Sequence, residues 1–250
     1  LVDRCFRQLG GGNAGSSVFL LSQAMGGGKT HSMVSLGLMA RDPALRKRVM
    51  GTNDPAPSLG KVKVIGFNGR NVEPAFGVWG SLAEQLGRRD NFKNYYQPLS
   101  APGPQAWKEL LEGQPVIVLL DELPPYMEHA RSVQVGNSDL AVVTATALAN
   151  LLVAASEMDS VCVVISDLGG ANWQAGGDMI QHALSNLKNE ARRSAVPITP
   201  VNPQGDELYH ILRCRLFEKL PGRNEIEKVA DAYRKSHAEA VKMGLTTTQS

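Results

Sequence analysis

The sequence contains few cysteines, and their arrangement excludes several classes of protein. Cys5, Cys162 and Cys214 lie far apart in a chain of 250 residues. No pair has the spacing of zinc ligands, and an odd number spread this widely does not predict a disulfide framework. Cys162 lies in an apolar run and is interpreted as a small buried hydrophobic residue. The cysteines therefore favour a protein of the reducing cytoplasm.

Excess charge of one sign is also missing. The 26 basic and 24 acidic residues leave a net charge of +2, which is too balanced to indicate nucleic acid or an anionic membrane as a partner. No signal peptide is expected, because charged residues begin at Asp3 and no apolar segment follows them. The chain begins with Leu1 rather than Met, and we expect it to be a piece of a longer protein.

Long hydrophobic runs are scarce, and the longest weakly charged segment covers residues 140–158. Thr144, Asn150 and Glu157 interrupt it, so we interpret it as a helix buried in an α/β core and expect no membrane partner. The chain is 43% hydrophobic, which is sufficient for a sizeable core.

Short apolar runs alternate with segments of helical periodicity. This alternation predicts a three-layer α/β domain whose parallel sheet is covered by helices on both faces. Residues 88–104 are expected to form a connection without regular structure, because they are polar and rich in proline. The predicted strands are 18–22, 61–67, 116–120, 161–166 and 198–201, and the predicted helices are 30–40, 78–86, 105–112, 138–158, 174–194, 206–217 and 224–243.

A glycine-rich segment, SQAMGGGKTHSM, lies between the first predicted strand and the first predicted helix. Glycines allow a backbone to turn its N–H groups around phosphates, and a lysine and a hydroxyl residue after them can contact the phosphates and Mg²⁺. Gln23 stands where the usual pattern has its first glycine, so a simple glycine-rich turn is the alternative. The candidate nucleotide-binding residues are Gly26, Gly27, Gly28, Lys29, Thr30 and His31, and Thr30 would also bind Mg²⁺. His31 is included because it directly follows Thr30, and its side chain is interpreted as structural.

An acidic pair, Asp121-Glu122, follows the continuous apolar run 116–120. At the carboxyl end of a buried strand, such a pair is suited to Mg²⁺–ATP hydrolysis. We expect Asp121 to hold Mg²⁺ and Glu122 to orient and deprotonate the attacking water. Lys29 is expected to contact the phosphates. An acidic turn that merely ends the strand is the alternative.

Further polar residues extend the candidate site. Ser166 ends the strand 161–166 and would contact the γ-phosphate or the water, with Asp167 beside it and Asn172 as a weaker alternative. Arg192 or Arg193 could complete a neighbouring subunit's site as an arginine finger, or form only a basic last turn of a helix.

Two other groups of basic residues are given structural interpretations. Arg213 and Arg215 are more simply surface residues than nucleotide sensors. A mixed basic and aromatic run could contact nucleic acid, but a solvated loop with its aromatic side chains packed into the domain is favoured. This run consists of Arg88, Arg89, Phe92, Lys93, Tyr95 and Tyr96.

The order of VFLLS, GGGKT, KVKVIGF, VIVLLDE, VCVVISD and PITPV resembles an AAA+-like P-loop ATPase. More narrowly, GGGKTH, LLDEL and DELYHILRCRLFE are similar to segments of large prokaryotic ATPases encoded among phage-defence genes, including those of BREX-type systems. The resemblance implies a P-loop core over residues 1–203, the start of a helical lid over 204–250, and a longer parent protein.

The residues and the resemblance together predict an enzyme that binds ATP with Mg²⁺ and hydrolyses it. The resemblance further implies a motor or switch module in a larger cytoplasmic assembly for DNA-related phage defence, either a homo-oligomer or a complex with other defence subunits. DNA contact is open. Two alternatives remain, namely a nucleotide-gated interaction module with little hydrolysis and a P-loop small-molecule kinase.

Overall fold

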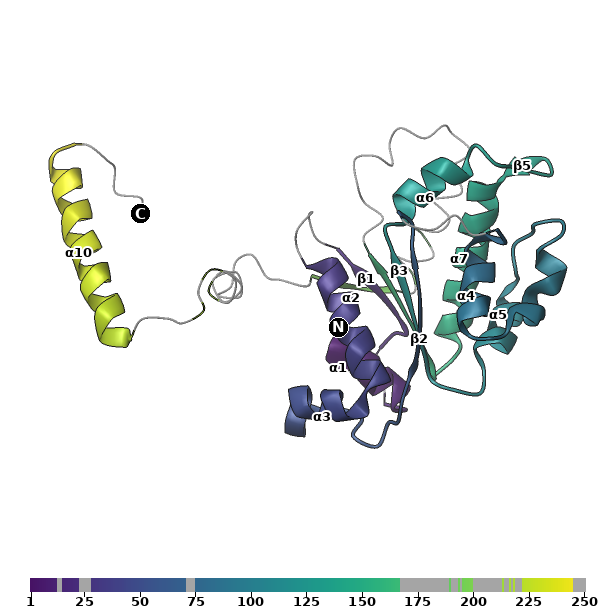
Figure 1. Cartoon of the computed structure of the whole chain (residues 1–250), viewed down its shortest axis with the longest axis horizontal. Coiled ribbons are helices and arrows are strands. Elements are labelled where there is room, and N and C mark those ends of the chain that lie inside the picture. Colours follow the sequence, from purple (N-terminus) through teal and green to yellow (C-terminus); the bar gives the residue numbers. More distant parts are fainter. Residues whose placement is uncertain are drawn as a thin grey trace. The chain divides into compact units, whose positions relative to one another are not determined.

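The structure is a computed structural model of the chain (Figure 1). It divides into two units, Leu1–Val201 and Asn202–Ser250, which are described separately. The described residues are 1–12, 15–22, 28–70, 75–166, 189, 193, 195–199, 213, 216, 218 and 222–244. The predicted helices 174–194 and 206–217 lie almost entirely outside them.

A five-stranded sheet forms the centre of the first unit, and every described strand pair in it is parallel. The strand order is β2-β3-β6-β1-β7. The strands are β1 Val18–Leu21, β2 Lys63–Asn68, β3 Val116–Asp121, β6 Val161–Ser166 and β7 Ala195–Ile198. The prediction of an α/β fold with a parallel sheet is confirmed, and the continuous apolar sequences of β3 and β6 follow from burial on both faces.

The path of the chain explains which helices cover which face. From β1 the chain crosses through α2 (Lys29–Arg41) to the edge strand β2, and it then returns through α4 (Gly77–Gln85) to β3 and through α7 (Leu140–Ser156) to β6. Such crossovers are right-handed, so a helix that connects strands in one direction across the sheet covers one face, and a helix that connects them in the opposite direction covers the other face. Figure 1 shows α2 on one side of the sheet and α4 and α7 on the other.

Two hydrophobic cores result, one on each side of the sheet. The first lies under α1 (Val2–Leu9), α2 and α3 (Pro43–Met50), and a 3₁₀ turn, η1 (Gly51–Asn53), follows α3. The second lies under α4, α5 (Pro104–Leu111), α6 (Leu123–Ala130) and α7. The predicted helix 138–158 is confirmed as α7, a largely buried core helix. Among the described residues, no helix has the length and apolarity needed to cross a membrane.

The segment 88–104 was expected to lack regular structure, and this prediction was wrong in part. Residues Arg89–Tyr95 form a 3₁₀ helix, η2. Its Phe92 is fully buried and meets Trp107 edge to face, with ring centroids 5.0 Å apart. Tyr96 is also buried. The favoured interpretation, aromatic side chains packed into the domain, is therefore confirmed for Phe92 and Tyr96, which cannot stack on bases.

Other boundaries also differ from the prediction. The last strand of the sheet was expected at 198–201, after Pro197, but β7 includes Pro197. Proline is tolerated there because β7 is an edge strand. A short hairpin of β4 (Gln134–Val135) and β5 (Ser138–Asp139) precedes α7, and the Asp139 side chain accepts a hydrogen bond from Val142 N.

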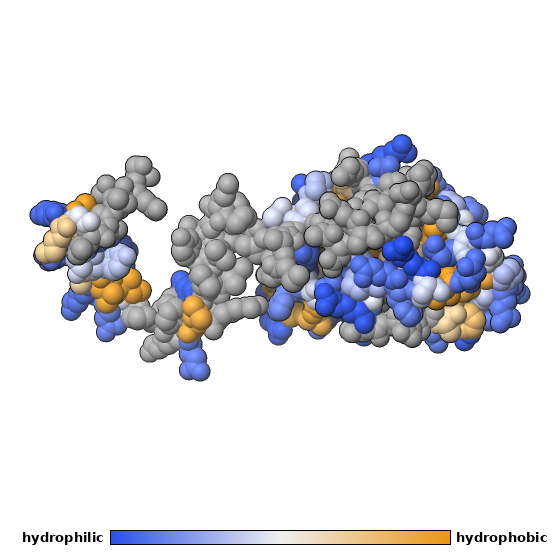
Figure 2. All heavy atoms as spheres, turned by 90° about the horizontal axis from the view of Figure 1, so that it is seen from above, coloured by the Kyte–Doolittle hydropathy of each residue, from blue (hydrophilic) through white to orange (hydrophobic). Residues whose placement is uncertain are grey.

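The described part of the second unit consists mainly of one helix, α10 (Arg223–Lys242). It agrees with the predicted helix 224–243. Ile226, Val229, Tyr233 and Met243 are all exposed on or beside it. Figure 2 shows hydrophobic residues on this helix beside hydrophilic ones.

Candidate functional site

The carboxyl ends of the strands lie along one edge of the sheet, because the strands are parallel. The connection that leaves β1 crosses one face of the sheet and the connection that leaves β3 crosses the other, so the crossing side reverses between these two strands, which flank β6. In open α/β sheets, ligands bind beyond the carboxyl ends of the strands where such a reversal occurs. The residues that end β3 and β6, Asp121 and Ser166, are both buried at this edge, with 8% and 5% of their surface exposed.

A hydrogen bond joins the start of α2 to the end of β3. Thr30 lies in the first turn of α2, and its Oγ1 donates to Asp121 Oδ2 over 2.7 Å. Because β6 lies between β1 and β3 in the sheet, this hydrogen bond reaches across the carboxyl end of β6. Two hard oxygen ligands, a hydroxyl and a carboxylate, are thereby held side by side.

The amino end of α2 is shaped by Gly28. This residue is the N-cap and has a φ of 81°, a left-handed conformation that favours glycine. Lys29 is the first helical residue, and Ser32 N donates to Gly28 O over 2.9 Å. The N–H groups of the first turn have no partner within a helix, and the helix dipole adds partial positive charge. Such a helix start is suited to an anion.

Glu122 has an unusual backbone conformation. Its φ of 52° makes it the one non-glycine residue with positive φ among the residues described. Its N–H donates to Asp121 Oδ1 over 3.0 Å and to Ser166 Oγ over 3.3 Å. A left-handed non-glycine residue costs of order 1–3 kcal/mol, and such strain clusters at functional sites. Ser166 and Asp121 thus hold the backbone of Glu122 in place.

The segment after β2 contacts Glu122 from the neighbouring strand. Arg70 Nε lies 3.2 Å from Glu122 Oε2, and Arg70 N donates to Asn68 Oδ1. Gly69 N donates to Asp121 O over 3.0 Å. A Cβ on Gly69 would lie 2.0 Å from Glu122 O, so the close approach of the two chains requires glycine.

Residues 52–178 match the family model described as the DUF499 N-terminal domain, and the match covers just over half of the chain. The chain belongs to the DUF499 family. The matched part of this DUF499 chain includes β2, β3 and β6, with Asp121, Glu122 and Ser166, while Lys29 and Thr30 precede it. A search of curated proteins finds no match to the chain.

The DUF499 structure brings together Thr30, Asp121, Glu122 and Ser166, four of the residues selected from the sequence. Gly28 and Lys29 lie directly before Thr30, and the neighbouring His31 is exposed. Gly26, Gly27, Arg192, Asp167, Asn172 and Arg215 lie outside the described residues. Arg193 and Arg213 are exposed, and their roles stay predictions.

Sequence reasoning missed Asn68, Gly69 and Arg70. A signal for them was present, because they directly follow the predicted strand 61–67. Parallel strands end at the same edge, so polar residues there belonged among the candidates.

Proposed function

We propose that this DUF499 chain binds Mg²⁺–ATP at the start of α2 and hydrolyses it with Glu122 as the general base. The observation that carries the proposal is the hydrogen bond from Thr30 Oγ1 to Asp121 Oδ2. It joins the glycine-rich segment to the acidic pair, the two sequence features from which the chemistry was predicted. The P-loop, AAA+-like identity of the core and a motor or switch role in a larger defence assembly belong to the same proposal.

The amino end of α2 supports the nucleotide part of the proposal. Gly28 turns the backbone into a helix of 13 residues, whose dipole and first-turn N–H groups favour phosphate. Lys29 would reach the β- and γ-phosphates as a point charge. Charge-assisted hydrogen bonds contribute about 1.5–3 kcal/mol, so removing this side chain would weaken ATP binding roughly 10- to 100-fold.

The donor set at Thr30 and Asp121 fits Mg²⁺. This ion prefers oxygen ligands, keeps several waters and is commonly held by one or two carboxylates together with substrate phosphates. Among the described residues, there is no group of three or more His, Cys, Asp or Glu side chains suited to a metal ion. A site of one carboxylate and one hydroxyl, completed by phosphate oxygens and water, agrees with this finding.

Glu122 is placed to act on a water molecule beside the phosphates. It directly follows Asp121, and its side chain is 38% exposed, so its carboxylate can reach solvent. In the proposed reaction Glu122 accepts the proton of water as the water oxygen attacks the γ-phosphorus, and the products are ADP and phosphate. Ser166 serves as a positioning residue, because its hydroxyl accepts a hydrogen bond from Glu122 N.

The test is phosphate release from Mg²⁺–ATP by the wild-type chain and by Glu122→Gln, with ATP binding measured in parallel. We expect Glu122→Gln to bind ATP normally and to release phosphate at least about 100-fold more slowly, the usual contribution of a general base. Turnover by Glu122→Gln at the wild-type rate would exclude this role. Wild-type protein that binds ATP but releases no phosphate would favour the nucleotide-gated module, and phosphate released without an added acceptor would exclude the kinase.

A further inference from the structure

A basic surface lies at the other end of α2 from the candidate site. It is formed by the exposed side chains of Arg41, Lys47, Arg48 and Lys61, and we call it the α2–α3 basic surface. Arg41 ends α2, Lys47 and Arg48 lie on α3, and Lys61 lies two residues before the start of β2. A helix of 13 residues is about 20 Å long, so this surface is separate from the ATP site.

Backbone contacts hold these elements together. Asp42 ends α2 and caps α3, since its side chain accepts hydrogen bonds from Ala44 N and Leu45 N. Val62 N donates to Ala40 O over 2.9 Å. That bond fixes the segment carrying Lys61 beside the end of α2.

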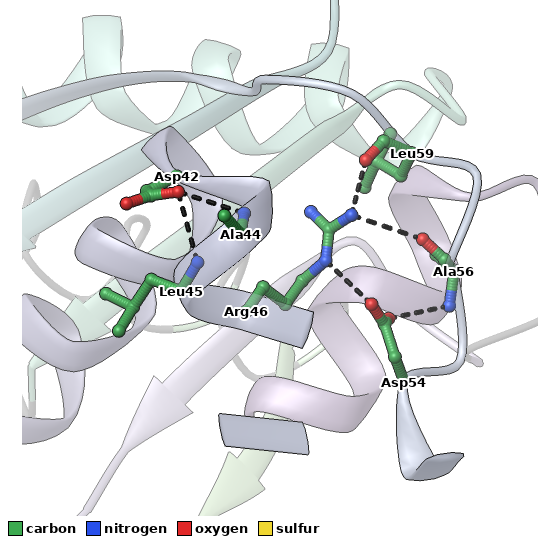
Figure 3. A network of polar contacts seen from close by, with 7 residues as sticks. All are labelled: Asp42, Ala44, Leu45, Arg46, Asp54, Ala56 and Leu59. Carbon is green, nitrogen blue, oxygen red and sulfur yellow. Dashed lines mark hydrogen bonds and ion pairs between the residues drawn. The ribbon is translucent and has the colours of Figure 1, made fainter. Parts of the chain in front are cut away.

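The buried side chain of Arg46 attaches the loop after α3 to the helix (Figure 3). Its Nε lies 2.9 Å from Asp54 Oδ2, and its second terminal nitrogen donates to the carbonyl oxygens of Ala56 and Leu59. Figure 3 shows these contacts converging on one guanidinium. The loop continues to Lys61, so Arg46 fixes the path of the chain between α3 and the segment that carries this lysine.

The acidic residues of this region offset only part of its positive charge. Residues 41–63 contain six basic and two acidic residues, although the whole chain has a net charge of only +2. Asp42 is used as a helix cap, and Asp54 is paired with Arg46, with 6% of its side chain exposed. Among the described residues, none of the four exposed basic side chains of this surface forms an ion pair.

We propose that the α2–α3 basic surface binds the phosphate backbone of a nucleic acid. Exposed Arg and Lys side chains without acidic partners gain most from a polyanion, because binding releases its condensed counterions. The guanidinium groups of Arg41 and Arg48 can each bind phosphate oxygens in a bidentate manner. Within residues 41–63 there is no aromatic residue, and Val49 is the one large hydrophobic side chain that is strongly exposed. The surface thus lacks aromatic membrane anchors, and its exposed apolar side chains are limited to Val49 and, one turn before Arg41 on α2, Leu38.

The test is fluorescence anisotropy of a labelled 20-base-pair duplex titrated with the full chain at several salt concentrations. The test variant is Lys47→Glu/Arg48→Glu. The matched control is Lys235→Glu/Lys242→Glu on α10, which changes the net charge equally and also replaces exposed residues. Each neutralised phosphate contributes about 0.9 to the slope of log K against log salt. We expect the test variant to bind at least about ten-fold more weakly at low salt, with a slope smaller by about 2.

The expected control result is wild-type affinity within about two-fold and an unchanged salt slope. Equal losses in both double variants would contradict the proposal, because the effect would then follow net charge and not this surface. Failure of the wild-type chain to bind the duplex would also overturn it. If the wild-type chain binds a polyglutamate peptide or vesicles containing phosphatidylserine as tightly as it binds the duplex, the proposal is also overturned, since the surface would then serve acidic proteins or membranes.

Discussion

Thr30 and Asp121 are separated by 91 residues in the sequence, yet the hydroxyl of Thr30 donates a 2.7 Å hydrogen bond to Asp121 Oδ2. The bond joins the helix after β1 to the end of β3, a strand that is not adjacent to β1 in the sheet. The two side chains therefore meet across the end of β6. Both oxygens suit Mg²⁺, and the ATPase proposal rests on this meeting.

Replacing Arg70 with alanine is expected to raise the rate of phosphate release. Arg70 pairs with Glu122 Oε2 at 3.2 Å and so competes with water for the proposed base. Both partners are partly exposed, and ion pairs of this kind contribute up to about 1 kcal/mol. Turnover at saturating ATP is therefore expected to rise by up to about five-fold in Arg70→Ala. Arg70→Lys is the control because it keeps the positive charge. A fall in turnover for Arg70→Ala alone would contradict the expectation, because it would show that the positive charge at this position assists the reaction.

Replacing Gly69 with alanine is expected to destabilise the first unit and to disturb Glu122. The new Cβ would lie 2.0 Å from the carbonyl oxygen of Glu122, so backbone must move. Overpacking of this kind costs about 1–3 kcal/mol, measurable by urea unfolding. Gly60→Ala is the matched control, because a Cβ there meets no atom within 4 Å. Equal stability of the two variants would contradict the packing described at Glu122.

The free energy of unfolding is expected to fall as the pH rises above about 9. A hydrogen bond with Cys5, followed by burial, raises the pKa of the Cys162 thiol well above its ordinary value of 9.0. The unfolded chain therefore releases this proton near pH 9 while the folded chain keeps it, so stability is complete below pH 9 and declines above it. One such group changes stability by about 1.4 kcal/mol per pH unit.

Urea unfolding between pH 8 and pH 10 measures this dependence. Cys162→Val is the comparison, because it removes the thiol and keeps an apolar side chain of similar size. Its stability is expected to decline less steeply between pH 9 and pH 10. The same slope in both proteins would show that Cys162 does not retain its proton on folding. Burial also raises the pKa of Tyr126, whose effect begins only above pH 10.

Much of the fold and most of the candidate site could be predicted from the sequence. VFLLS, VIVLL and VCVVIS are short continuous apolar runs, and burial on both faces of a parallel sheet leaves this pattern in a sequence. Asp121, Glu122 and Ser166 were selected because they end such runs. Because the predicted strands are parallel, the sequence also indicated that these three residues lie at the same edge of the sheet.

Other features depend on which strands are neighbours, and apolar periodicity does not contain that information. Arg70 and Gly69 reach Glu122 because β2 pairs with β3. Pro197 could be placed within β7 only once that strand was known to lie at the edge of the sheet. The left-handed backbone of Glu122 is held by hydrogen bonds that its N–H donates to Asp121 at the end of β3 and to Ser166 at the end of β6. This conformation has no local signal in the sequence.

The most direct test of the account is calorimetry of ATP binding with and without Mg²⁺, on the wild-type chain, Thr30→Val, Thr30→Ser and Asp121→Asn. If Thr30 and Asp121 hold the ion, Mg²⁺ strengthens ATP binding in the wild type and in Thr30→Ser, which keeps the hydroxyl. Thr30→Val and Asp121→Asn are expected to lose most of this strengthening, roughly 10-fold or more, because the first removes an oxygen ligand and the second removes the negative charge of the carboxylate. Equal Mg²⁺ dependence in all four proteins, or no ATP binding by folded wild-type protein, would contradict the proposed site.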